Sequence, residues 1–296
     1  MKSKIFWVIV IIGALIAVLW HQDKALKKEF FEEPLEGKVA KEGVDLEQKV
    51  LSFTIDGRSP KGAKQWHLEG ASADIMDDEI HLNELRAVAY GDDTVINLKS
   101  DSGIYRKEKG EVELIGNVEV TSDDGFTLIT ERASWSQLTK DITTDEVVYI
   151  NREGMSAVGT GGQANSDNRT ATLKKDVTVS IEPDTEVNCN GRLDVDYNGN
   201  VAIFYDNVKV KDKDGNLIAD KLTVDFDPDT QQLARVTAEG NVKLKRGKSY
   251  TISEKAIYTE STKSAKLVGR PRVIIDPEEM EGLETFPGSG DTEENS

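Results

Sequence analysis

LIADKLTVDF, residues 217–226, decides the fold, because the alternation of its inward apolar residues shifts by one position in the middle of the stretch. Apolar residues recur at every second position before the Asp220-Lys221 pair and again from Leu222 onward, which is the period of a strand with one buried face. The two sets are out of step by one residue. The pair must therefore absorb an extra residue, which predicts a β-bulge where the strand bends sharply.

The same pattern recurs along the chain. Its copies begin at residues 68, 98, 128, 158, 187, 217 and 251, so the steps are 30, 30, 30, 29, 30 and 34 residues. A second phrase, with GNVEV at 116 and GNVKL at 240 as examples, follows the first in each unit. So regular a period predicts one supersecondary unit stacked on copies of itself.

The units are predicted to consist of strands and turns. Val118 and Val120 alternate with polar residues, and turns such as Asp123-Asp124-Gly125 suit the positive φ angles of hairpins. No segment after residue 33 has a helical period. We therefore predict an all-β fold of repeated antiparallel strands, curved by a bulge in each unit.

The charge and cysteine content of the chain argue against nucleic-acid binding and against an internal disulfide. The net charge is −17, and no basic stripe is available to neutralise phosphates, so the sequence predicts no nucleic-acid partner. Residues 276–296 contain eight acidic residues and no Lys or Arg, and we expect this tail to be disordered. Cys189 is the single cysteine and cannot form an internal disulfide.

The N-terminus predicts a membrane anchor. Between Lys4 and Asp23 lie 18 residues without a charged Lys, Arg, Asp or Glu, which as a helix measure about 27 Å and can span a thin hydrocarbon core. Lys2 and Lys4 favour a cytoplasmic N-terminus. The alternative is a cleaved signal peptide, but no small-x-small motif and no cysteine follow the apolar run. We assign residues 1–22 to the anchor and 23–48 to a juxtamembrane helix and linker.

No segment shows the residues of an enzyme. His21, His67 and His81 lack a metal-ligand spacing, so no zinc site is expected. RGKS at 246–249 and GTGGQA at 159–164 resemble nucleotide-binding motifs in their letters only, and we interpret them as a hairpin turn and a bent strand. The acidic turns DKDG and DFDPD are explained by turn chemistry, with calcium binding as the less favoured alternative. We predict no catalytic residue, no metal and no cofactor.

Two readings of the curved sheet remain open at this point. Its inner face can be filled by its own side chains as a closed core, or it can stay open as an apolar trough. The first strand, KVLSFTI, and the last, RVII, have no covering helix in the sequence. Both sheet edges are therefore expected to be free for strand addition.

Four segments before residue 182 carry a resemblance in their order and spacing: GAKQWHLEGASADI, INLKSDSGIYRKEKGEVELIGNVEV, ITERASWSQLTKDITTDEVV and REGMSAVG. They resemble a known family, the LptC-type membrane-anchored periplasmic proteins of the lipopolysaccharide export machine, and this resemblance covers the anchor and extends to about residue 182. Three later segments are GNLIADKLTVDF, VTAEGNVKLKRG and KAIYTESTKSAKLVGRPRVI. These resemble the soluble LptA bridge component and the wider OstA-like domain.

The resemblance implies a domain plan and a fold. Residues 49–182 would form an LptC-like open β-jellyroll, residues 183–275 an LptA/OstA-like continuation, and 276–296 the acidic tail. The chain is longer than the usual anchored member, so it would hold either one continuous trough or two stacked jellyrolls. Whether a separate soluble bridge protein is also needed stays open.

The resemblance also implies a function outside enzyme chemistry. The protein would sit in the inner membrane with its C-terminal domain in the periplasm. It would accept lipopolysaccharide from an inner-membrane ABC transporter of the LptBFG type and pass it to an LptA-like bridge protein by edge-strand pairing. The alternative is a membrane-tethered β-solenoid scaffold or adhesion protein with a closed core.

The residues expected to line the inner wall and bind lipid share an apolar side chain and an inward position. They are Trp66, Leu68, Ile75, Leu98, Tyr105, Val118, Val120, Leu128, Trp135, Leu217, Val224, Val242 and Tyr258. Gly62 and Gly154 match glycines of the family pattern, and we expect them where the sheet bends or a partner approaches.

Overall fold

The chain forms one long antiparallel β-sheet. The computed structural model describes residues 38–40, 48–58, 64–90, 95–136, 138–165, 167–213 and 215–276. These residues contain an 18-stranded sheet, which confirms the prediction of an all-β fold of antiparallel strands. Among them there is no helix that could cross a bilayer. The predicted anchor, juxtamembrane helix and most of the acidic tail lie outside the described residues.

Most strands are 10 to 14 residues long. They are β1 (Lys38–Ala40), β2 (Gln48–Arg58), β3 (Lys64–Ile75), β4 (Glu79–Tyr90), β5 (Val95–Arg106), β6 (Glu111–Ser122), β7 (Thr127–Ser136), β8 (Asp141–Arg152), β9 (Met155–Asn165), β10 (Thr170–Ile181), β11 (Thr185–Cys189), β12 (Leu193–Asp196), β13 (Val201–Asp212), β14 (Gly215–Phe226), β15 (Leu233–Arg246), β16 (Ser249–Thr259), β17 (Ser264–Val268) and β18 (Arg272–Ile274).

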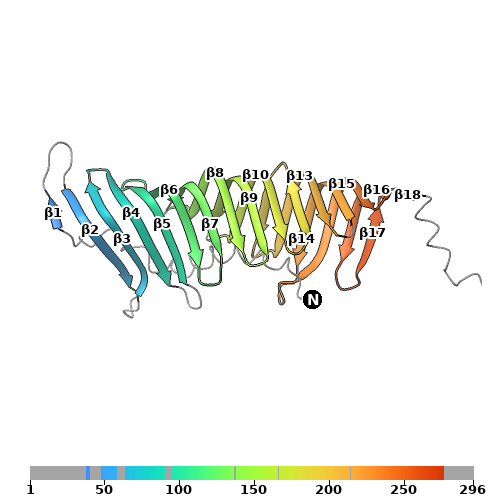
Figure 1. Ribbon diagram of the computed structural model, residues 1–296, viewed down its shortest axis with the longest axis horizontal. Helices are drawn as coiled ribbons and strands as arrows, with labels where there is room; N and C mark the ends of the chain where they lie inside the picture. The colour runs from blue at the N-terminus through green and yellow to red at the C-terminus, as the bar shows by residue number, and fades with distance from the viewer. Residues whose placement is uncertain are drawn as a thin grey trace, which may run out of the picture.

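The strands follow one another along the sheet in chain order (Figure 1). β11 and β12 together act as one interrupted strand, since each pairs with β10 on one side and β13 on the other. β17 and β18 share β16 in the same way. β1 lies within the segment expected to be linker and pairs with Lys49–Leu51 of β2. The first predicted edge strand is therefore covered over these three residues.

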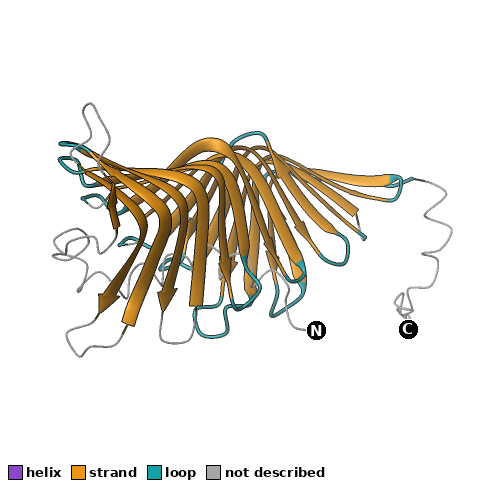
Figure 2. Cartoon of the chain, turned by 60° about the vertical axis from the view of Figure 1, so that its left-hand side comes forward, coloured by secondary structure: helices purple, strands orange, loops and turns teal. Residues whose placement is uncertain are grey.

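The strands bend at a bulge near their middle. The register shifts between Ile218 and Lys221 where β14 pairs with β15, which confirms the bulge predicted at Asp220-Lys221. Equivalent shifts occur at Lys99/Ser102 and Glu239/Val242. Because the bends line up from strand to strand, the sheet is folded over along its length into two walls that meet at a crease (Figure 2).

Side chains at the bend explain why the sequence repeats two phrases. Asn117 Nδ2 donates to Asp101 Oδ2 at 2.8 Å, and Asn241 Nδ2 donates to Asp220 Oδ2 at 2.8 Å. The residue before each asparagine is a glycine with positive φ, +75° at Gly240. In each case, the acid of the first repeated pattern accepts a hydrogen bond from the asparagine of the Gly-Asn pair, which belongs to the second pattern on the neighbouring strand.

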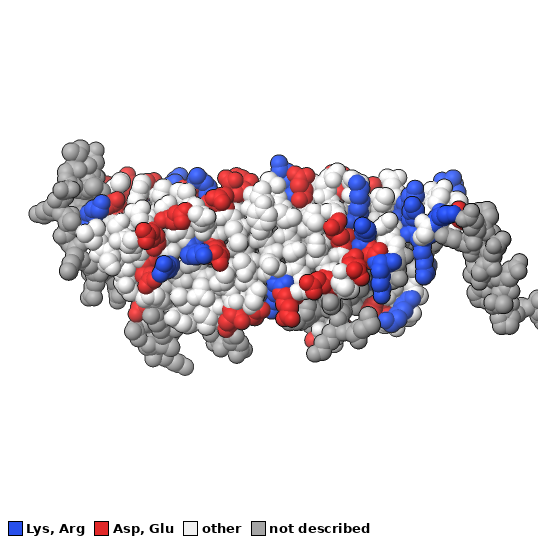
Figure 3. Space-filling view, in the orientation of Figure 1, with Lys and Arg blue, Asp and Glu red and all other residues white. Residues whose placement is uncertain are grey.

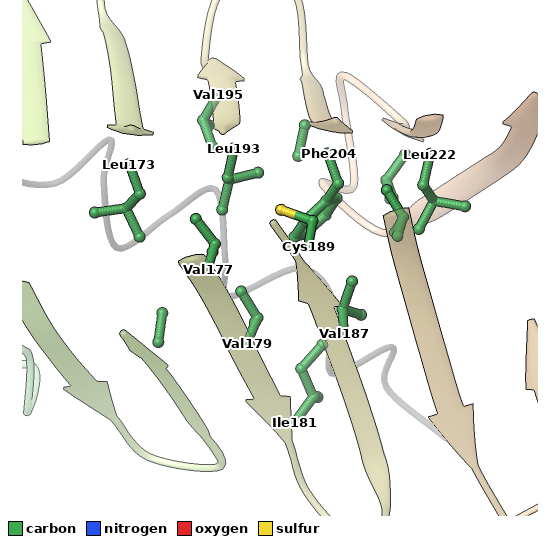
Figure 4. Packing of buried hydrophobic residues seen from close by; sticks show 14 of the residues in the cluster. Leu173, Val177, Val179, Ile181, Val187, Cys189, Leu193, Val195, Phe204 and Leu222 are labelled. Carbon is green, nitrogen blue, oxygen red and sulfur yellow. The ribbon is translucent and has the colours of Figure 1, made fainter. Parts of the chain in front are cut away.

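Apolar side chains fill the crease. Val118, Val208 and Val242, next to the bends, are at most 1% exposed. A large cluster extends from Ile96 to Ala256, and a smaller one surrounds Val50, Leu82 and Tyr105 at the N-terminal end. In Figure 4, Val179, Val187, Leu193 and Phe204 lie together within the large cluster, so both walls contribute to it.

Candidate functional site

A first apolar row runs along the inner face of one wall. Each member pairs in register with the next, from β3 to β17. The first row is Ile75, Ile80, Tyr105, Val112, Trp135, Ile142, Ala164, Ala171, Val195, Ala202, Val224, Val236, Tyr258 and Ala265.

A second apolar row runs along the other wall, on the far side of the bends. In β6, for example, Val112 belongs to the first row and Val120 to the second, with Gly116 and Asn117 between them. The second row is Ile55, Leu68, Ala87, Leu98, Val120, Leu128, Ile150, Ala157, Val179, Val187, Val210, Leu217 and Leu244. The two rows face the space between the walls, as alternation along a pleated strand requires.

Several members of the two rows are less buried than the crease. Leu98, Leu128, Leu217 and Leu244 are partly buried against the large cluster, while Val118 next to the bend is 1% exposed. The site is therefore a trough with a filled floor and apolar sides that are still accessible. An apolar and uncharged surface of this kind can bind hydrocarbon chains, and the phenol groups of Tyr105 and Tyr258 are the only acid-base groups within the two rows.

The two rows are most buried in the middle of the sheet. Six residues of β9 to β13 from both rows are buried, and three of them are alanines. Small side chains let two sheets approach closely, and five of the six residues belong to the large cluster to which both walls contribute. We call these six residues the waist: Ala157, Val179, Val187, Ala171, Val195 and Ala202.

The predicted inner-wall residues all lie on the inner face. Val118 and Val242 are in the floor, and Trp66, Tyr105, Val120 and Val224 are also buried. Leu68, Ile75, Leu98, Leu128, Trp135, Leu217 and Tyr258 are partly exposed along the sides. Gly62 lies outside the described residues. Gly154 lies in the β8–β9 turn with φ of +76° and open space around it.

Sequence reasoning missed several members of the two rows. Val112, Ile142, Val236 and Val210 lie in the rows but were not among the predicted residues. Val112 and Ile142 stand close to strand ends, among polar residues that weaken the alternation. Each lies four residues before the second phrase of its unit, which begins at 116 and 146, and this fixed spacing was the available signal.

Several charged groups form pairs on the outer faces. Arg106 Nη2 donates to Glu113 Oε2 at 2.7 Å, and Arg132 donates to the other carboxylate oxygen. The hydrogen bond from Arg106 is the main reason that the pKa of Glu113 lies below its ordinary value. Cys189 is buried, and burial raises the pKa of its thiol, which keeps it in the unreactive protonated form. No group of His, Cys, Asp and Glu that could hold a metal ion is found among the described residues.

A cavity with a mixed polar and apolar lining lies at the rim of the trough next to the waist. It has a volume of about 740 Å³ and is lined by the β8–β9 and β10–β11 turns, including Met155, Ile181 and Lys211. Arg152 lies at its border, is 7% exposed and donates to Asp124 Oδ2 at 2.6 Å. The cavity mixes polar and apolar groups, unlike the trough.

Comparisons with known proteins match the two parts of the chain separately. A family model described as lipopolysaccharide-assembly, LptC-related, matches residues 7–182. A second model, described as LptA/(LptD N-terminal domain) LPS transport protein, matches residues 190–284. The gap between the two matches, residues 183–189, covers the β10–β11 turn and β11, which contributes Val187 to the waist.

The chain is similar to a solved structure of a lipopolysaccharide-transport component. The structure is LptH from Pseudomonas aeruginosa, titled the LptA homologous periplasmic component of the conserved lipopolysaccharide transport device. It is 15% identical, with a TM-score of 0.36 over 42% of this chain and 95% of that chain. The comparison with curated proteins gives no match.

Proposed function

Since this chain belongs to the LptC-related family of lipopolysaccharide-assembly proteins, we propose that it carries lipopolysaccharide between its two walls on the way to the outer membrane. The observation that carries the proposal is the pair of apolar rows, which continue in register along the sheet and stay partly accessible at the sides. Acyl chains would lie between the rows, and the sugars would stay outside in water.

Burial of hydrocarbon supplies the affinity. Each buried CH₂ group contributes about 0.8 kcal/mol, so one acyl chain in the trough is held firmly without any specific polar contact. Neighbouring positions along a row, such as Leu128 and Ile150 of the second row, are chemically alike. A lipid that slides by one strand therefore exchanges similar contacts for similar contacts, and the movement needs little net free energy per step.

The partners follow from the family and from the two ends of the sheet. We propose that residues 1–22 anchor the protein in the inner membrane and that an ABC transporter of the LptBFG type loads lipid at the N-terminal end. At the other end, β17 and β18 are the last strands of the sheet and expose Val268 and Val273. An LptA-like bridge protein can extend the sheet there by strand pairing.

The second candidate is a structural scaffold with a closed core. The filled crease and the buried waist favour it, because both are packed without room for a ligand. The partly exposed residues Leu128, Trp135 and Tyr258 favour the trough instead. The two candidates therefore differ in what touches the sides of the trough in the cell.

In-cell photocrosslinking tests the proposal. A photoreactive residue at Trp135, half-buried in the first row, is expected to form an adduct with lipopolysaccharide that depends on ATP. Glu131 lies on the same strand but is exposed on the outer face, and a probe there is the matched control. Leu128→Glu is expected to abolish transport, while Leu128→Met preserves it. A folded protein without adducts at Trp135, Leu128 and Leu217 would support the closed scaffold.

A further inference from the structure

The outer face of the second-row wall carries a set of basic residues between β13 and β18. Lys209 and Lys243 flank Ile218 in register, and Arg272 follows beyond Ile252. Lys211 and Lys245 flank Asn216 in the next row outward. We call these five cations, Lys209, Lys211, Lys243, Lys245 and Arg272, the basic wall.

These cations have no carboxylate partner within the part of the chain that the structure describes. No ion pair joins any of the five to a described Asp or Glu residue, and all five are exposed. Elsewhere, Lys99 pairs with Glu119 and Lys174 pairs with Asp145. Residues 240–275 hold nine Lys or Arg residues and two Glu residues in a protein with a net charge of −17. Figure 3 shows Lys and Arg side chains gathered at the β15–β18 end of the molecule.

The acidic tail begins beside this wall. The backbone nitrogen of Asp276 donates to Ser249 Oγ at 3.1 Å, and Ser249 pairs with Arg246 at the β15–β16 turn. The 20 residues from 277 to 296 can reach roughly 66 Å when extended. Four strand spacings separate β13 from β18 along the basic wall, roughly 19 Å. The tail is therefore long enough to cover the wall.

The tail and the wall match in two properties. Residues 278–294 of the tail have seven acidic residues and no basic residue, whereas the basic wall consists of five cations, with Glu186 of β11 next to it opposite Lys211. The wall also exposes Ile218, between Lys209 and Lys243, and Ile274, two residues after Arg272 on β18, each 38% accessible. Apolar residues follow the acids of the tail, at Met280, Leu283 and Phe286. Tethering raises the effective concentration of the tail at the wall, so modest contacts suffice.

We propose that the tail, residues 278–294, docks on the basic wall of its own chain. Docking neutralises the wall next to the open C-terminal edge of the sheet and keeps other anionic molecules off it. The contact is electrostatic and exposed, so it weakens as salt rises. This inference does not depend on whether lipid occupies the trough, because the basic wall lies on the outer face.

Zero-length carbodiimide crosslinking of the full chain in detergent micelles tests the proposal. The reagent joins a carboxylate to a lysine amine only where the two touch. We expect crosslinks from tail acids to Lys243 and Lys245 in the monomer, mapped by mass spectrometry. They should disappear in 1 M salt, where the screening length is about 3 Å.

A matched pair of variants provides the control. Lys243→Glu should reduce tail crosslinks to Lys209 and Lys245, whereas Lys266→Glu, on the outer face of the opposite wall near the same end, should leave them unchanged. Three results would overturn the proposal: no tail crosslinks, equal crosslinking to Lys266, or crosslinks found only in dimers. The last result would place the tail on a second copy of the chain.

Discussion

At the bend of β15, Gly240 combines a φ of +75° with close contact to the neighbouring strand. A Cβ added there would overlap with Asp220 Oδ2, the atom that accepts the hydrogen bond from Asn241. We predict that Gly240→Ala lowers the free energy of unfolding by about 3 kcal/mol, because it adds backbone strain and displaces a hydrogen-bonded acid. Urea unfolding followed by circular dichroism measures this loss.

Gly125 is the control for that substitution. Its φ is +84°, but nothing lies within 4 Å of an added Cβ. Gly125→Ala should therefore cost only the strain of a positive φ, about 1 kcal/mol. Equal losses in the two variants would show that the contact between Gly240 and Asp220 contributes nothing to stability.

The sequence located these bends but not their chemistry. The change of step at Asp220-Lys221 predicted a bulge, and the structure has one there. The hydrogen bond from Asn241 to Asp220 could not be predicted, since it joins residues 21 positions apart whose meeting depends on the register of two strands. The pattern of one strand shows which of its residues share a face. Which polar groups on neighbouring strands contact each other depends on the register between the strands, which that pattern does not contain.

At the scale of strands, Glu113 of β6 joins β5 and β7 through Arg106 and Arg132. Its pKa is lowered chiefly by the hydrogen bond from Arg106, so the carboxylate stabilises the fold fully above its ordinary pKa of 4.5. That contribution disappears as the pH falls through the lowered folded-state pKa. We predict that Glu113→Gln costs about 1 to 2 kcal/mol at pH 7 and progressively less as the pH falls below 4.5.

Urea midpoints measured from pH 7 to pH 3 test this dependence. Glu119→Gln, on the same strand, removes a more exposed pair with Lys99 and should cost less than about 0.5 kcal/mol. If the loss caused by Glu113→Gln is independent of pH, the ion pairs are not its origin.

The strands themselves were largely predictable, and their interruptions were not. A repeat of 30 residues gives two strands of about 12 residues with their turns, as observed for β5 and β6. β11 and β12 break at Asn190 to Arg192, where Gly191 approaches the carbonyl of Tyr205 too closely for a side chain. β1 has three residues and carries no periodic pattern, so its pairing with β2 depends on tertiary contact alone.

At the scale of the molecule, the inner face was predictable, but its variation along the length was not. Alternation placed Leu128 and Tyr258 inward, as the structure has them. The waist depends on the small volumes of Ala157, Ala171 and Ala202, which come from strands on opposite walls. The alternation of apolar and polar residues does not distinguish alanine from larger apolar residues, although side-chain volume decides how closely the two walls can approach.

The waist leads to a prediction about how lipid occupies the trough. Residues on either side of it, such as Trp135 and Tyr258, are partly exposed, whereas Val179 and Val195 are buried by the opposite wall. An acyl chain can lie against Trp135 and Tyr258 without moving the walls. To reach Val179 and Val195, it must separate a packed cluster. Photoreactive probes along the two rows should therefore give two maxima of lipopolysaccharide adduct, separated by a minimum at Val179 and Val195. Cooperative urea unfolding of each probe variant provides the folding control. A maximum at the waist would mean instead that the walls part there and that one continuous trough holds the lipid.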